Sequence, residues 1–202
     1  MGSINFLGGV IKMLINSKVL AAALIFGAAV SPAMADGYYG ALDLGQAKAK
    51  DACTGLPAGV TGCKDTATLY RIAGGYQFVP MWGAEVSYAA YGKESAGTLG
   101  ALSEDWQLSS FQVSGTGTFP LGNAFSLIGK LGIARTEIKL SGGVANVNAT
   151  RTSLAYGIGA QYDFTKSVAV RAQYEGLGTV GDANTTGTTK VTLLSAGVVL
   201  KF

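Results

Sequence analysis

The side chains best suited to polar chemistry in this chain are charged residues within segments of alternating apolar and polar positions. They are Asp43, Arg71, Glu85, Lys130, Asp163, Arg171 and Glu175. Charged groups enclosed together away from water are costly unless they pair. We therefore expect them to form a polar network of ion pairs. For Arg171 we favour Glu85 over Glu175 as partner, because Glu175 lies roughly 13 Å away along the same strand.

Catalytic chemistry is disfavoured by the complete lack of His in the sequence. Lipases, acyltransferases and proteases typically depend on a His general base. Two cysteines without His partners do not favour a metal site, and the C-x-x-C pattern of redox enzymes is absent. We expect no catalytic residue, no metal site and no cofactor.

The first 35 residues have the pattern of a secretory signal peptide. Lys12 and Lys18 precede an apolar run at 19–30, and a small-residue cleavage site follows at 33–35. The run, about 12 residues, is too short to span a bilayer as a helix. We expect residues 1–35 to be removed, which leaves one domain at 36–202.

Loss of the two lysines lowers the net charge from +3 to +1, which gives no support for nucleic-acid binding. Export also bears on Cys53 and Cys63, the only cysteines of the chain. An oxidising compartment favours a disulfide between them.

Eight segments of the domain alternate between apolar side chains and small or polar ones, as strands with two different faces do. They cover residues 38–47, 67–79, 82–92, 106–119, 125–140, 152–164, 168–177 and 189–202. Each is long enough for a tilted membrane-spanning strand, and lipid requires such strands to close into a barrel. The sequence predicts an all-β fold, an eight-stranded antiparallel up-and-down transmembrane barrel.

Short and long connections alternate between these segments, as periplasmic turns and external loops do. The short ones are 80–81, 120–123 and 165–167, and the four long ones are 48–66, 93–105, 141–151 and 178–188. Aromatic residues gather at the short-turn end, where they are expected to form a membrane-interface girdle. They are Phe78, Trp82, Phe119, Phe125, Phe164 and Phe202.

A soluble eight-stranded barrel of the lipocalin type is the competing architecture. It would point apolar side chains inward and polar ones outward. The charged face found here would make a poor lipid cavity, and an exterior carrying Leu154, Tyr156 and Ile158 would aggregate in water. The membrane barrel is therefore the better interpretation.

Several stretches resemble those of a known family. They are Gly83-Ala84-Glu85-Val86-Ser87-Tyr88, Leu127-Ile128-Gly129-Lys130-Leu131-Gly132, Gly157-Ile158-Gly159-Ala160-Gln161-Tyr162-Asp163-Phe164-Thr165, Arg171-Ala172-Gln173-Tyr174 and the terminal Leu194-Ser195-Ala196-Gly197-Val198-Val199-Leu200-Lys201-Phe202. With these the chain resembles the OmpA-type (opacity/OmpX-like) outer-membrane barrels of Gram-negative bacteria. The resemblance implies an outer-membrane location, with lipid and lipopolysaccharide as surroundings. The soluble peptidoglycan-binding domain that many members carry is expected to be absent.

The resemblance also implies roles for particular residues. The last strand, with Leu194, Val198, Leu200 and Phe202, looks like the signal read by the barrel insertion machinery after delivery by periplasmic chaperones. In the family a lumen network blocks or gates a small channel, and Glu85 and Arg171 look like its members. Thr116 and Gln161 stand where the family often has Lys and Glu, so a gate that switches partners is in doubt.

Two functions follow as expectations. The first is a non-enzymatic, monomeric barrel that supports envelope integrity and meets host or other surface ligands through its external loops, including in adhesion. The alternative is a narrow, non-specific pore for ions and small solutes. A static lumen plug favours the first, and an intermittently open network favours the second.

Overall fold

The computed structural model describes residues 37–50, 53, 61–92, 94–99, 102–141, 147–182 and 187–202. They form the strands β1 (Tyr38–Lys50), β2 (Thr66–Val79), β3 (Trp82–Tyr91), β4 (Glu94–Leu99), β5 (Leu102–Gly122), β6 (Phe125–Ser141), β7 (Val147–Asp163), β8 (Val168–Asp182) and β9 (Gly187–Lys201). The predicted signal peptide, 1–35, lies outside the described residues. Within them, no helix has the length and apolar character needed to cross a membrane.

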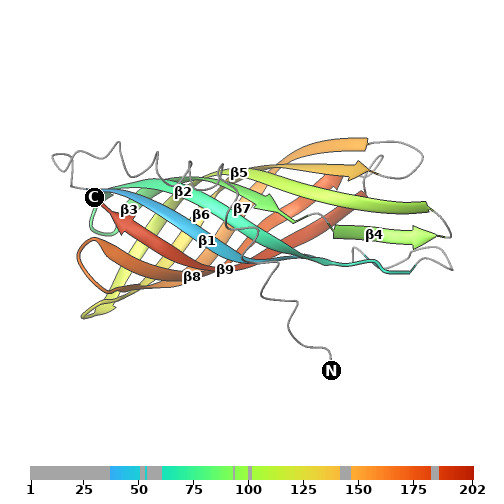
Figure 1. Cartoon of the computed structure of the whole chain (residues 1–202). Helices are drawn as coiled ribbons and strands as arrows, with labels where there is room; N and C mark the ends of the chain where they lie inside the picture. The colour runs from blue at the N-terminus through green and yellow to red at the C-terminus, as the bar shows by residue number, and fades with distance from the viewer. Residues whose placement is uncertain are drawn as a thin grey trace, which may run out of the picture. The chain divides into compact units, whose positions relative to one another are not determined.

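The strands close into an antiparallel barrel (Figure 1). Each strand pairs with its neighbours in the order β3-β2-β1-β9-β8-β7-β6-β5-β4, and a further pairing of β3 with β5 closes the sheet. Both β3 and β4 pair with β5, along different parts of its length, so together they occupy one strand position. The predicted eight-stranded all-β barrel is confirmed.

The register shows that the strands are tilted. The row that starts at Leu44 passes through Tyr70, Ala90, Ser109 and Glu137 and reaches β7 at Thr150. In the other direction it passes through Ala196 and Ala172 and reaches β7 at Ala160. This stagger is what closing a barrel from tilted strands requires.

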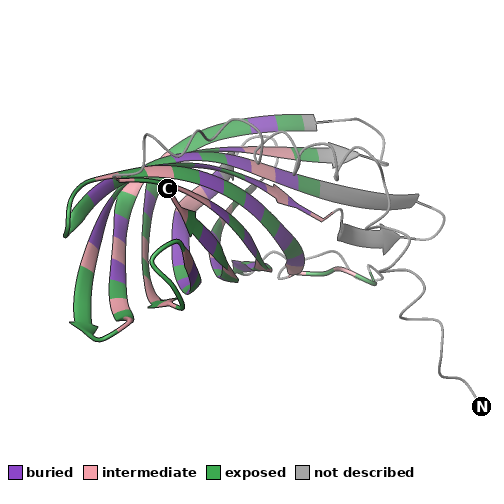
Figure 2. Ribbon diagram, turned by 60° about the vertical axis from the view of Figure 1, so that its left-hand side comes forward, coloured by how far each residue is buried: buried purple, intermediate pink, exposed green. Residues whose placement is uncertain are grey.

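The large apolar side chains lie on the outer face of the sheet, whereas in a soluble barrel they would lie on the inner face. Exposed and buried residues alternate along the strands wherever burial is described (Figure 2). The exposed positions are large and apolar, and Ile158 is 71% exposed. The buried positions are mostly small or polar. An apolar exterior of this extent suits lipid and not water, as the sequence predicts.

The interior differs from the wholly polar lumen that the alternation suggests. A layer of buried apolar residues fills the barrel toward the long connections, and it includes Leu69, Tyr91, Leu177 and Leu193. A thinner layer of Ala41, Ala73, Ala169 and Val199 lies toward the short turns. In a barrel of this size the lumen is just wide enough for side chains to fill. The charged residues therefore lie between two apolar layers.

The predicted long loops are shorter than expected because the strands continue beyond the apolar band. Strand β7 begins at Val147 and β9 at Gly187, within the stretches predicted as loops. Likewise β4 and β5 leave only residues 100–101 between them. Outside the membrane both faces of a strand meet water, so the alternation that marks a strand disappears while backbone pairing continues. The three short turns connect the strands as predicted.

Candidate functional site

Six of the seven charged residues predicted for the lumen meet inside the barrel. They are Asp43 on β1, Arg71 on β2, Glu85 on β3, Lys130 on β6, and Arg171 and Glu175 on β8. Every one of these side chains is at most 3% exposed. Three acids face three bases, so the buried charges balance.

One half of this cluster is organised by Arg171. Its guanidinium donates to both carboxylate oxygens of Asp43, at 2.9 and 2.8 Å, and to Glu85 at 2.6 Å. The other oxygen of Glu85 accepts from the Lys130 ammonium at 2.7 Å. Glu85 is thus held between two cations. Arg171 therefore pairs with Glu85, the partner favoured from the sequence, and also with Asp43. It does not pair with Glu175, the other candidate partner.

The other half is organised by Glu175. Its carboxylate accepts from Lys130 at 3.3 Å and from the Arg71 guanidinium. Arg71 in turn donates to Asp43 at 2.9 Å. Each of the six groups therefore touches two of opposite sign, and the contacts close into a ring of alternating charge, which we call the charge ring.

Neutral side chains complete the charge ring, and the sequence analysis missed them. The Tyr39 hydroxyl donates to Glu85 at 3.1 Å, and the Gln112 amide donates to Glu175 at 3.3 Å. Arg71 also donates to Gln173 and, at 3.0 Å, to Ser195. All four lie on the inward faces of their strands. Their alternation with outward residues in the sequence could therefore have identified them.

Glycines in the intervening strands allow these pairs to form. Asp43 and Arg171 are both register partners of Gly197, which lies between them on β9. A Cβ at Gly197 would stand 2.3 Å from the Asp43 carboxylate. Only a residue without a side chain leaves Asp43 and Arg171 in contact across the strand.

The same arrangement occurs twice more. Gly157 lies between Lys130 and Glu175, and its Cβ would stand 2.5 Å from Glu175 Cγ. Gly75 lies between Tyr39 and Glu85, and its Cβ would stand 2.2 Å from the Tyr39 ring. Glycine in a strand often marks a place where other atoms approach closely. Here three glycines make room for three polar contacts.

Asp163, the seventh predicted member, lies apart from the charge ring. It ends β7 at the short-turn end of the barrel and pairs with Lys201 at 2.8 Å, with both side chains 32% exposed. Gln161 also donates to it at 2.8 Å. The sequence showed that Asp163 points inward but not its level along the barrel. Thr116 is buried, and neither it nor Gln161 adds a charge to the ring.

Aromatic side chains are exposed near both ends of the outer wall. Phe78, Trp82, Phe119, Phe125 and Phe164 surround the short turns, and Phe202 follows β9. Tyr70, Tyr88, Phe111 and Tyr174 form a second exposed set toward the long connections, which the sequence analysis did not single out. Membrane barrels carry such aromatic residues at both interfaces.

Two further predictions can be located. Cys53 and Cys63 are joined by a disulfide in the connection between β1 and β2. On β9, Leu194, Val198 and Leu200 all face outward, with Leu194 63% exposed. Among the residues that the structure describes, no group of three or more His, Cys, Asp or Glu is placed to hold a metal ion.

The charge ring can seal the lumen but offers little for chemistry. Its charged groups are paired with one another and almost completely buried. Breaking one member of a buried pair leaves an uncompensated charge, which costs about 3–5 kcal/mol. The arrangement therefore favours a fixed plug.

Comparison with protein families gives one extended match. The model of the outer membrane protein beta-barrel domain matches residues 19–202. Outer membrane protein A of Salmonella typhi is 30% identical over 138 residues, which are 64% of this chain and 38% of that protein. The chain thus spans well under half the length of that relative.

Three solved structures share the fold. Neisserial surface protein A is 22% identical, with a TM-score of 0.62, over 83% of this chain and 99% of that one. The N-terminal β-barrel domain of Pseudomonas aeruginosa OprF is 15% identical, with a TM-score of 0.54, over 84% and 100%. Ail of Yersinia pestis, in complex with the heparin analogue sucrose octasulfate, is 20% identical, with a TM-score of 0.52, over 82% and 99%.

Proposed function

The chain belongs to the outer membrane protein beta-barrel domain family and lies in the bacterial outer membrane, and on this premise we propose that it is a non-enzymatic structural barrel. In this role it supports envelope integrity and carries an external surface for interactions, including adhesion. Residues 1–35 act as the cleaved signal peptide. The terminal strand with Phe202 acts as the signal for the insertion machinery.

The filled lumen is the observation that carries this proposal. The charge ring is almost completely buried, and Leu69, Leu177 and Leu193 beside it are 2% exposed or less. A water-filled channel would leave its lining side chains accessible to water. A barrel without such a channel can act only through its outer wall and its external surface.

Paired strand ends and a disulfide contribute to the external surface. Strands β5 to β9 extend beyond the apolar band, and the disulfide between Cys53 and Cys63 ties the β1–β2 connection together. Because Ail has been captured with a heparin analogue, a sulfated glycan is a suitable first probe for a surface ligand of this barrel. The lack of His supports the non-enzymatic part of the proposal.

Complementation of a deletion strain tests the two parts of the role separately. We expect the deletion to raise sensitivity to detergents and to lower attachment to heparin-coated surfaces. The intact gene should restore both. A variant with the connection at 51–65 replaced by a short turn should restore detergent resistance but not attachment. Unchanged resistance and attachment in the deletion strain would contradict the proposal.

The pore alternative makes a different prediction for liposomes. A narrow pore would let small sugars enter, and liposomes that contain the barrel would swell in an isotonic sugar solution. We expect no more swelling than in liposomes without protein. Liposomes with a general porin serve as the positive control, and swelling by this barrel would favour the pore.

A further inference from the structure

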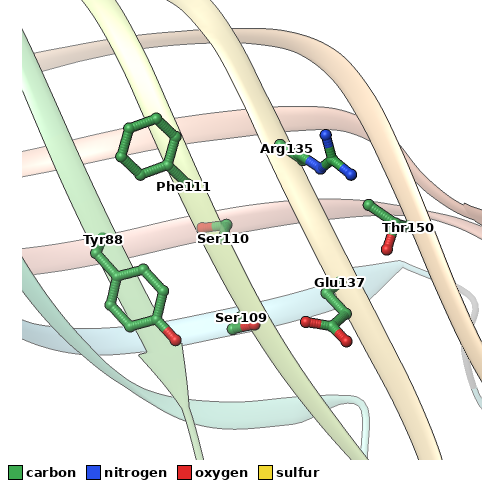
Figure 3. Close-up of a pocket in the computed structure, with 7 residues that line it drawn as sticks. All are labelled: Tyr88, Ser109, Ser110, Phe111, Arg135, Glu137 and Thr150. Atoms are coloured by element: carbon green, nitrogen blue, oxygen red, sulfur yellow. The ribbon is translucent and has the colours of Figure 1, made fainter.

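A shallow groove of about 400 Å³ lies on the outer wall of the barrel, across β3, β5, β6 and β7 (Figure 3). The aromatic side chains of Tyr88 and Phe111 lie on one side of it, and Arg135, Glu137 and Thr150 lie on the other. The groove continues the lipid-facing surface toward the external end, where Phe111 is 48% exposed. Neither the charge ring nor the proposed function uses this part of the wall.

Two charges of opposite sign stand next to each other in this groove. Arg135 and Glu137 are two positions apart on the outward face of β6, and the Glu137 side chain is 40% exposed. Glu137 pairs with Lys139 at 3.3 Å, whereas Arg135 makes no hydrogen bond or ion pair with any residue that the structure describes. A cation beside an anion is complementary to the same two residues on another copy of this wall.

Two copies inserted in the same direction can share a twofold axis along the membrane normal, and twofold dimers are the commonest assemblies. Such an axis keeps each residue at its own height and places the same wall of both copies face to face. With the axis between Arg135 and Glu137, the guanidinium of each copy faces the carboxylate of the other. Two positions along a tilted strand differ in height by about 5 Å, which an Arg side chain spans.

The wall below this groove carries small residues. Because the strands are tilted, the residues that lie below Arg135 along the membrane normal are on β5 and β3 and not on β6. Gly115 and Ala84 lie about 15 Å below Arg135, and Gly74 lies beside them on β2. All three are exposed within the apolar band. Together with the groove they form a vertical strip, which we call the contact strip.

The barrel itself does not require the two glycines of the contact strip. A Cβ at Gly74 would meet no atom within 4 Å, and one at Gly115 would meet only the Leu131 carbonyl oxygen, at 3.8 Å. Neither glycine has a positive φ. Glycine within a strand costs stability and often marks a place where another backbone approaches closely. The glycines of the charge ring have such neighbours inside the barrel, and these two can find one only outside it.

We propose that the barrel forms a symmetric homodimer in the membrane through the contact strip. Each Arg135 pairs with Glu137 of the partner copy, so the groove carries two ion pairs at the external end of the interface. The three small residues let the two walls approach closely within the lipid. The monomer expected from the sequence is then one half of a dimer.

Sedimentation equilibrium of the folded barrel in a density-matched zwitterionic detergent tests this proposal. We expect a reversible equilibrium between monomer and dimer. Arg135→Glu and Glu137→Arg each place like charges across the axis, and each is expected to weaken dimerisation about tenfold or more. The double variant exchanges the two charges and restores both pairs. It is expected to dimerise as the native barrel does.

A matched pair of alanines tests the lower part of the contact strip. Ala84→Leu fills the centre of the strip and is expected to weaken dimerisation about tenfold. Ala172→Leu is the control, because Ala172 on β8 is also an exposed, lipid-facing alanine but lies on another side of the barrel. We expect it to leave dimerisation unchanged. Heat-modifiable gel mobility confirms that each variant is folded.

Cross-linking in native outer membranes with a short bismaleimide shows whether the dimer forms there. Phe111→Cys, beside the axis, is expected to give cross-linked dimers. Tyr174→Cys, a similarly exposed aromatic position on β8, is expected to stay monomeric. The proposal is overturned if the native barrel sediments as a monomer at every concentration, or if the double charge exchange does not restore the dimer. It is also overturned if Phe111→Cys stays monomeric in the membrane, as it would if lipid filled the groove.

Discussion

At the scale of single residues, the ion pairs of the charge ring are strong because their side chains are buried away from water. Glu85 accepts hydrogen bonds from Lys130, Arg171 and Tyr39, so its carboxylate is compensated on every side that the structure describes. The Glu137–Lys139 pair on the outer wall has the same chemistry, but its side chains are 40% and 53% exposed. The two glutamates offer a matched comparison of burial.

Glu85→Gln is expected to lower the free energy of unfolding by about 3–5 kcal/mol, because it leaves Lys130 and Arg171 with one uncompensated positive charge. Glu137→Gln removes an exposed pair and is expected to cost about 0–1 kcal/mol. Urea unfolding of both variants in the same lipid vesicles measures the difference. Equal, small losses would mean that the lumen is hydrated.

Gly197 offers a second test at this scale, because its substitution changes no charge. Gly197→Ala places a methyl group against the Leu42 carbonyl oxygen and the Asp43 carboxylate, and is expected to destabilise the barrel by about 1–3 kcal/mol. Gly129→Ala on β6 is the control, since a Cβ there meets no atom within 4 Å. We expect it to change stability by about 0.5 kcal/mol or less. Similar unfolding midpoints for the two variants would contradict the role given to Gly197.

At the scale of strands, the outer face is stable because it meets lipid. Along β7 the outward residues Leu154, Tyr156, Ile158 and Tyr162 are all exposed, and Thr150 and Asn148 follow toward the external end. In water such a strand would be a site of aggregation. One strand therefore contains both a lipid-facing position and a solvent-facing position on the same face.

Ile158→Lys is expected to destabilise the folded barrel in vesicles by about 2–4 kcal/mol, as a cation near the middle of the lipid face does. Asn148→Lys, on the same face beyond the apolar band, is expected to cost about 0–1 kcal/mol. Unfolding titrations in vesicles give both values. If the two variants lose the same stability, the apolar band has been placed wrongly.

The sequence predicted strands well wherever one face meets lipid and the other meets the lumen. The alternation identified the lipid-facing residues of β7 and the inward position of Arg171. Beyond the apolar band both faces meet water, so the extensions of β7 and β9 could not be predicted. The partner of Arg171 was only partly predictable, because its contact with Asp43 depends on the register of three strands and on the gap at Gly197.

At the scale of the whole barrel, the lumen is closed twice. The charge ring closes it by ion pairing, and the apolar layer around Leu69 and Leu193 closes it by packing. The two closures use different physics, so loss of one should not open the other. This is why we assign the barrel a structural and surface role and not that of a pore.

Single-channel recording in planar bilayers tests this closure directly. We expect the native barrel to give no conductance steps across the voltage range in which a general porin conducts. Gly197→Ala, which disturbs the charge ring but not the apolar layer, should also stay closed. Reproducible conductance steps from the native barrel would contradict the closed lumen and would favour a narrow pore.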